Sequence, residues 1–286
     1  MTGFIAQLLN GLQYGLLLFL IGSGLTLIFG VMGVINLAHG SLFMIGAYLA
    51  YVVAGATGSF WIALPAAILG GAAFGAILER VLFRHFRHRE HLDQVLLTFA
   101  LILLFEEGRS ALIGNQFHSV PVPAALDFSV PVVGGFAYSA YRLAVLVICL
   151  VVAAAMVLVV ERTRFGAAIR AAAEQPDMVD LLGLDARLIH TAVFAAGTAL
   201  AMLAGALAAP LQSVQPGMGD GFLILSFIVV VIGGLGSVAG AFWAALLVGL
   251  IDTLGKVYLP QVAGIAVCGL MAAVLLWRPA GLFAKG

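Results

Sequence analysis

Few residues of this 286-residue chain could carry out chemistry, and long apolar stretches separate them. Ser23 lies between Gly22 and Gly24, where a hydroxyl could act as a nucleophile. Such a serine needs a base beside it. No histidine within an apolar stretch is an evident base, since His39 lies at the boundary of one. The sequence therefore argues against an enzyme, and we expect no catalytic residue.

Metal chemistry has an equally weak basis. His85, His88 and His91 recur at intervals of three, but they lie among arginines and show no ligand pattern with cysteines or carboxylates. Cys149 and Cys268 lie inside apolar runs, which does not resemble a metal site or a disulfide framework. We interpret the histidines as part of a solvated basic anchor, and we expect no metal and no cofactor.

Two pairs of opposite charges interrupt apolar stretches. Glu106 and Arg109 are three residues apart, and Asp252 and Lys256 are four apart, so each pair can meet on one face of a helix. A charge in the middle of a membrane costs roughly 3 kcal/mol on insertion scales, so such groups are either paired or functional. Each pair fits a structural ion pair near the headgroups or a role in passing a zwitterion.

Polar residues and glycines also gather at two turns. Asn36 and His39 lie at the first turn, between Gly33 and Gly40. Asn36 could cap the next helix and His39 could bond a free carbonyl, or both could line a partly unwound path, and these roles are compatible. The second turn is rich in glycine. The candidates for a translocation path are Asn36, His39, Gly233, Gly234, Gly236 and Ser237.

The elements that position these residues must suit lipid. Residues of the AVILMFWYC set make up 63% of the chain and charged residues only 9%, against about 25% charged in a soluble domain. The first charged residue is Glu79. Thirteen basic residues balance thirteen acidic ones, which leaves no positive field for nucleic acid. The composition thus excludes an ordinary soluble enzyme and predicts a membrane protein.

The apolar runs are long enough for helices, which need about 20 residues to cross about 30 Å of hydrocarbon. We expect an all-α polytopic membrane protein: a single domain (1–286) forming a helical bundle of eight or nine transmembrane spans. The seventh run has only eleven residues, so a short or broken helix is expected there. The predicted spans are Ile5–Phe29, Leu37–Ala54, Phe60–Phe83, Val95–Ile113, Leu143–Val160, Ile189–Leu211, Phe222–Ile232, Val238–Val257 and Val262–Trp277.

Basic residues predict the orientation, because cytoplasmic loops carry an excess of them. Ten of the 13 fall on one side of this arrangement. We therefore expect a multi-pass membrane protein with a cytoplasmic C-terminus and the N-terminus outside. Segment 161–187 would be cytoplasmic and loop 114–141 would lie outside. The ten basic residues are Arg80, Arg84, Arg87, Arg89, Arg162, Arg164, Arg170, Arg187, Arg278 and Lys285.

Segment 161–187 holds nine of the 26 charged residues and predicts two short helices. Phe165–Glu174 is rich in alanine, a good helix former. Proline breaks this helix and suits the first position of a second one, Pro176–Leu182, which Gly183 ends. The second helix could rest on headgroups or dock into a cytosolic partner. Its apolar face consists of Met178, Leu181 and Leu182.

Three motifs follow one another along the chain. The first is Gly33–Gly40 (GVINLAHG), the second is Arg162–Gly166 (RTRFG) followed by Leu181–Gly183 (LLG), and the third is Gly233–Ser237 (GGLGS) followed by Gly240. In order and spacing, over nearly the whole chain, they resemble the permease of branched-chain amino acid ABC importers, the LivH-type membrane subunit.

The resemblance implies a non-catalytic subunit that moves branched-chain amino acids inward by alternating access. It also implies a bacterial inner (plasma) membrane, so the N-terminus and loop 114–141 would be periplasmic. Its implied partners are two ATP-binding subunits, a second similar permease, a periplasmic binding protein and the lipid bilayer, with no nucleic acid. Separate ATPases agree with this chain, because the stretch from Gly249 to Val257 lacks the glycine spacing and the Ser/Thr of a phosphate loop.

Under the same resemblance, the helix Pro176–Leu182 becomes the coupling helix that sits in a groove of the ATPase. The residues assigned to coupling are Arg170, Glu174, Pro176, Asp177, Met178, Leu181, Leu182 and Gly183.

Two alternatives remain at this stage. The same machinery could carry urea, a short-chain amide or another small polar solute. An ion-coupled secondary transporter fits less well, because few paired carboxylates are available in the spans to couple an ion.

Overall fold

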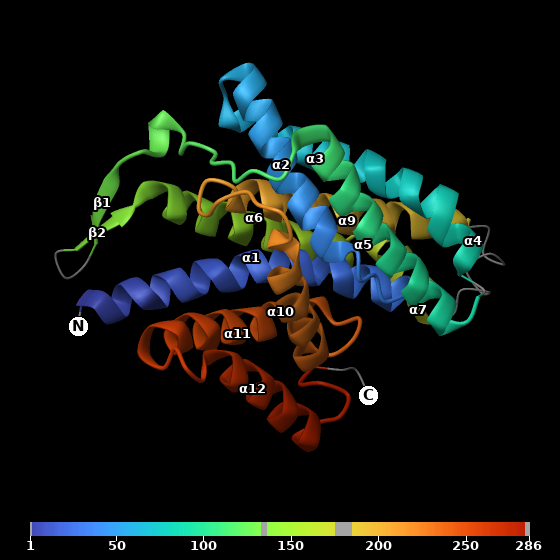
Figure 1. The fold of residues 1–286 in the computed structure, drawn as a ribbon. Coiled ribbons are helices and arrows are strands. Elements are labelled where there is room, and N and C mark those ends of the chain that lie inside the picture. Colours follow the sequence, from blue (N-terminus) through green and yellow to red (C-terminus); the bar gives the residue numbers. More distant parts are fainter. Residues whose placement is uncertain (1, 88, 133–135, 175–184, 284–286) are drawn as a thin grey trace.

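The computed structural model describes residues 2–87, 89–132, 136–174 and 185–283, and these consist mostly of helices (Figure 1). The long helices are α1 (Thr2–Met32), α2 (His39–Thr57), α3 (Phe60–Leu78), α5 (His91–Ile113), α6 (Ala140–Arg162), α9 (Ala186–Ala208), α10 (Met218–Gly233), α11 (Val238–Tyr258) and α12 (Ala263–Trp277). Shorter helical pieces are η1 (Glu79–Phe83), α4 (Arg84–Phe86), η2 (Ala124–Leu126) and α7 (Arg164–Glu174).

Helix α1 lies in the middle of the bundle (Figure 1). It carries no charged residue, and every side chain from Leu16 to Ile21 is buried, as expected of a helix that is apolar all round. It packs most extensively against α11 and also against α9, which in turn covers α2 and α3. The contact with α11 is close: a Cβ on Gly249 would lie 2.4 Å from Gly15 Cα. Small residues therefore bring the first helix and α11 together.

Six helices of the described residues are long and apolar enough to cross a membrane: α1, α2, α3 with its continuation to Phe86, α6, α9 and α11. Helix α5 is also 23 residues long, but it carries Glu106, Glu107 and Arg109. Helices α10 and α12 are apolar but have only 16 and 15 residues. The predicted all-α bundle is confirmed, whereas the predicted count of eight or nine spans is not.

The two arginine clusters lie at one end of the bundle, which we call the basic end (Figure 1). Burial lowers the pKa of Arg87 from its ordinary value, Glu79 opposes this shift, and the nearby charges of Arg84 and Arg187 lower the pKa further. At the other end, which we call the opposite end, Arg142 Nη1 donates to Asn10 Oδ1 at 3.0 Å near the start of α1.

The loop between α5 and α6 contains a small hairpin that the all-α prediction missed. Strands β1 (Ser129–Val132) and β2 (Phe136–Ser139) pair in antiparallel register, with Val130 opposite Tyr138. β-Branched and aromatic residues favour such pairs, but a strand of four residues is too short to show a period of two clearly. The same loop reaches the segment between α9 and α10 through a backbone bridge between His118 and Val214.

Candidate functional site

The first predicted turn runs back into the bundle. Helix α1 ends at Met32, and residues 33–38 are not helical. Helix α2 then begins at His39, whose Nε2 donates to the carbonyl oxygen of Ile21 at 3.1 Å, well inside α1. The His39 side chain is fully buried. Non-helical backbone at membrane depth is stable only where protein or a cavity surrounds it, so this segment belongs to the interior of the bundle.

Asn36 stabilises this segment locally. It is 1% exposed, and its Oδ1 accepts a hydrogen bond from Ala38 N at 3.1 Å. The side chain therefore forms a turn of the Asx type directly before α2, rather than occupying the cap position itself, which Ala38 takes. The expected bond from His39 to a carbonyl is also present. His39 thus makes the foreseen bond, whereas Asn36 stabilises the turn without capping α2. His39 Nδ1 is buried without a partner among the described residues.

The second predicted turn joins α10 to α11. Helix α10 ends at Gly233. The φ angles of Gly234 and Gly236 are positive, and the Ser237 hydroxyl accepts a hydrogen bond from Gly240 N at 3.1 Å. A Cβ on Gly240 would lie 2.0 Å from the carbonyl oxygen of Gly233. The glycines therefore serve both the turn and the close crossing of the two helices.

This turn borders a cavity of about 470 Å³ at the basic end, which we call the inner cavity. The inner cavity also touches Thr26 and Gly30 of α1, Glu161 of α6 and Arg170 of α7. It thus brings Gly236 and Ser237, predicted to lie on the path, next to Arg170, predicted to take part in coupling. Asn36, His39, Gly233 and Gly234 are not among the residues that line this cavity.

Arg170 holds α7 against the preceding helix. Its Nη1 donates to the carbonyl oxygen of Val160, near the end of α6. Helix α7 confirms the first of the two predicted short helices and ends at Glu174. The remaining coupling residues lie outside the described residues: Pro176, Asp177, Met178, Leu181, Leu182 and Gly183.

A buried carboxylate at the basic end escaped the sequence analysis. Glu79 begins the π-helical turn η1 and is fully buried, its Oε2 accepting from the Thr191 hydroxyl of α9 at 2.6 Å. Its Oε1 accepts from Arg87 Nη2 at 3.4 Å. Glu79 therefore ties the end of α3 to α9. Its place at the end of an apolar run, eight residues before an arginine, was the available signal.

Both predicted ion pairs are present. Arg109 Nη2 lies 3.3 Å from Glu106 Oε2, and Lys256 Nζ lies 2.6 Å from Asp252 Oδ2. The first pair is further fixed, because Arg109 donates to the Gly114 carbonyl at 2.6 Å and Glu106 Oε1 accepts from Gly217 N at 3.1 Å.

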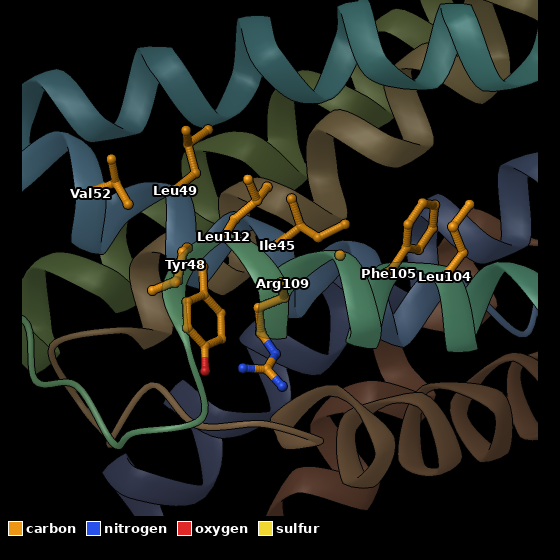
Figure 2. A pocket seen from close by; sticks show the side chains of 10 residues that line it. Ile45, Tyr48, Leu49, Val52, Leu104, Phe105, Arg109 and Leu112 are labelled. Carbon is orange, nitrogen blue, oxygen red and sulfur yellow. The ribbon is translucent and has the colours of Figure 1, made fainter.

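Arg109 also borders an apolar pocket of about 310 Å³ between α2 and α5. Figure 2 shows its guanidinium beside the ring of Tyr48, with the carbon atom Cζ 5.4 Å from the ring centroid. Leu104 and Leu112, which line the pocket, are 63% and 87% exposed. Apolar side chains so exposed on a membrane protein suit lipid contact, so this pocket is a poor path for a polar solute.

A second set of residues was also missed. Gln7, Asn10 and Gln13 recur every three residues on the otherwise apolar α1, and they line a cavity of about 390 Å³ at the opposite end together with Arg142 and Asp252. We call this the outer cavity. The spacing of three residues was the signal, since it places these polar side chains on one side of a helix.

Comparison with known proteins agrees with this architecture. Residues 7–276 match the family described as branched-chain amino acid transport system / permease component. The chain is 31% identical to the high-affinity branched-chain amino acid transport system permease protein BraD of Pseudomonas aeruginosa, over 99% of this chain and 96% of that protein.

Two Escherichia coli K12 proteins are similar as well. The permease protein LivH is 27% identical over 99% of this chain and 96% of its own length. The permease protein LivM is 29% identical over 92% of this chain and 67% of its own length. Both are named for a high-affinity branched-chain amino acid transport system. No solved structure matches this chain.

Proposed function

The chain belongs to the family of permease components of branched-chain amino acid transport systems, and from this premise we propose how its parts divide the work. It is a multi-pass membrane protein and a non-catalytic subunit of an ABC transport system. Transport then requires partners that hydrolyse ATP and a path that opens to one side at a time.

The partners are two ATP-binding subunits, a periplasmic substrate-binding protein and a second permease. The family supports an ABC assembly. A heteromeric permease pair is supported by the two E. coli relatives, since that organism has two permease proteins, LivH and LivM, for its branched-chain amino acid system. This chain matches a larger share of LivH, so its own place is the LivH-like one and its partner is LivM-like.

The basic end faces the cytoplasm in this proposal, because the arginine clusters gather there and cytoplasmic loops carry an excess of basic residues. The whole chain, 1–286, then acts as one domain with a periplasmic N-terminus, a periplasmic loop at 114–141, a cytoplasmic coupling loop at 161–187 and a cytoplasmic C-terminus.

Residues 175–184 form the contact that couples the permease to the ATPases. The main support is the position of these residues between α7 and α9. Helix α7 ends at Glu174 against α6, and α9 begins after Asp185, whose Oδ1 accepts from Arg187 N at 2.9 Å. Helix α9 continues into the centre of the bundle, where it packs on α1, α2 and α3. A force applied at the start of a rigid helix shifts the helices packed along it, so an ATPase gripping this loop can move the core.

The path passes the re-entrant segment of Asn36 and His39 and leaves by the inner cavity beside Gly236 and Ser237. Support comes from the buried non-helical backbone of the first region and from the cavity at the second. The glycine crossing of Gly233 and Gly240 lets α10 and α11 tilt about one point.

The test of coupling replaces Leu181 and Leu182 together with Asp. We expect the double variant to insert and assemble in the membrane, because the change lies outside the described spans, and to lose at least about tenfold in ATP-driven L-leucine uptake. Leu188→Asp is the matched control, since Leu188 is a 59% exposed apolar residue at the same end, outside the loop. Normal uptake by the double variant, or an equal loss in the control, would contradict coupling through this loop.

A further inference from the structure

The outer cavity is distinct from the inner cavity and has the chemistry of a ligand site. Its volume is about 390 Å³, and residues from α1, α6, α9, α10 and α11 line it. Binding sites for small molecules have volumes of roughly 300 to 1,000 Å³, a mostly apolar lining and a few placed polar groups. The outer cavity lies at the lower end of this range. The volume therefore suits a ligand of the size of one amino acid.

Three charged side chains meet at this cavity. Arg142 comes from α6, and Asp252 and Lys256 come from α11. Two positive charges and one negative charge leave an excess of one positive charge. Asp252 is 4% exposed as a residue, whereas the Lys256 side chain is 61% exposed. The carboxylate is thus held inside while the ammonium group remains accessible.

The polar side of α1 fixes the position of Arg142. Arg142 Nη1 donates to Asn10 Oδ1 at 3.0 Å and to Gln13 Oε1 at 3.5 Å. Tyr138 of β2 donates to the same Asn10 oxygen at 2.9 Å. Among the described residues Arg142 has no carboxylate within ion-pairing distance, so its charge is held in place but not neutralised. A guanidinium in this state is suited to bind a carboxylate.

The remaining lining is apolar. Leu17 of α1, Leu211 after α9 and Phe222 of α10 border the same cavity. Phe222 is held by two other rings, since it stacks on Phe43 with centroids 4.3 Å apart and meets Tyr14 at 5.5 Å. This rigid wall can receive a branched aliphatic side chain.

We propose that the outer cavity is a binding site for the zwitterionic headgroup of a free aliphatic amino acid, received before it moves inward. Arg142 and Lys256 bind the carboxylate, Asp252 binds the ammonium group, and the wall of Leu17 and Phe222 accepts the side chain. This inference deepens the proposed function and rests on it, because it gives the permease its own selectivity in addition to that of a binding protein.

The pair of Glu106 and Arg109, at the same end of the bundle, differs from the charged groups of the outer cavity. Arg109 donates to the Gly114 carbonyl and to Asn115, and Glu106 accepts from Gly217 N. Arg109 also borders an apolar pocket. That pair locks loops together. The outer cavity instead combines Arg142, which has no carboxylate partner among the described residues, with the ion pair of Asp252 and Lys256, whose lysine side chain is 61% exposed.

The experiment measures equilibrium binding of radiolabelled L-leucine to the assembled transporter in nanodiscs without the binding protein. L-Leucinamide, which lacks the carboxylate, and 4-methylpentanoate, which lacks the ammonium group, serve as competitors. For the wild type we expect each of them to bind at least about tenfold more weakly than L-leucine, the effect of losing one charged hydrogen-bonding group.

The variants assign each half of the ligand. Arg142→Gln should weaken L-leucine and 4-methylpentanoate about tenfold and leave L-leucinamide unchanged. Asp252→Asn should weaken L-leucine and L-leucinamide and leave 4-methylpentanoate unchanged. The matched controls, Arg84→Gln and Asp127→Asn, change exposed residues outside the cavity and should bind as the wild type does.

If Asp252→Asn does not assemble, Lys256→Gln replaces it, because the Lys256 side chain is 61% exposed and a glutamine amide can still donate a hydrogen bond towards Asp252. Lys256→Gln should weaken the same two ligands as Arg142→Gln. Absence of L-leucine binding to the wild type, or equal binding by all cavity variants, overturns the site. ATP-driven uptake of L-leucine with the binding protein added is measured in parallel. If the wild type takes up L-leucine and the cavity variants bind it as the wild type does, only this inference is wrong. If the wild type takes up no L-leucine, the proposed function is wrong.

Discussion

Asn36 stabilises the fold at a place where we propose that the solute also passes. Its side-chain oxygen accepts from Ala38 N, two residues along, in a segment without helical hydrogen bonds. His39 then anchors the same segment to Ile21 of α1. Since the backbone here must be satisfied within the bundle, a change at Asn36 alters both the local turn and any surface that a solute meets.

Replacing Asn36 with Ala separates these roles. Loss of one side-chain to backbone hydrogen bond costs about 1 kcal/mol, which is too little to prevent assembly. We expect a near-normal amount of protein in the membrane and a fall of at least about fivefold in L-leucine uptake. Ser59→Ala is the control, because Ser59 precedes α3 without a side-chain capping bond. Loss of the protein itself, measured by immunoblotting, would assign Asn36 to folding alone.

Residue types in this chain were easier to predict than their partners. The ion pairs of Glu106 with Arg109 and of Asp252 with Lys256 follow from helical spacing, and both are present. The contact of His39 with Ile21 spans 18 positions and that of Arg142 with Asn10 spans 132. Contacts across such separations depend on which helices become neighbours, and no local periodicity encodes that choice.

Among the elements, the pair α10 and α11 packs too closely to accept added volume. Gly233 and Gly240 bring the two backbones together, and a Cβ on Gly240 would lie 2.0 Å from the Gly233 oxygen. Backbone atoms cannot move aside as the end of a flexible side chain can. Overpacking of this kind typically costs about 1–3 kcal/mol.

Gly240→Ala should therefore lower the free energy of unfolding by about 3 kcal/mol and reduce the thermal midpoint of the purified protein. Gly269→Ala in α12 is the matched control, since no heavy atom lies within 4 Å of its added Cβ. That control should be neutral or stabilised by up to about 1 kcal/mol, because alanine is the better helix former. Equal midpoints for the two variants would show that the helices are not held by this crossing.

Element positions followed from hydropathy, but their lengths and number did not. The predicted span Phe60–Phe83 lies within α3 and its continuation, and the predicted short seventh span became α10, which begins four residues earlier. Hydropathy counts apolar residues and so overlooks helical turns built from Met218, Gly219 and Asp220. It also accepts α5 as a span without weighing its charges.

At the scale of the whole molecule, the distribution of basic residues predicts the orientation. His85 lies at the basic end and is exposed, whereas Phe117 lies in the α5–α6 loop and is 72% exposed. In a background with Cys268→Ser, since Cys268 is exposed and Cys149 is buried, single cysteines at these two positions report on opposite sides of the membrane.

We expect Phe117→Cys to react with a membrane-impermeant maleimide in intact spheroplasts, and His85→Cys to react only after permeabilisation. The Cys268→Ser background, which keeps only the buried Cys149, serves as the control and should not be labelled. Labelling with the reverse pattern would invert the orientation and place residues 175–184 on the wrong side for an ATPase.

The dominance of the α1–α11 contact also has a consequence for synthesis. A ribosome makes α1 first, yet its principal neighbour emerges more than 200 residues later. Until then the face of α1 that α11 covers must be sheltered by lipid, by the helices made in between or by the insertion machinery. The bundle therefore cannot be completed before α11 is made, and a chain truncated before α11 lacks the helix that covers α1.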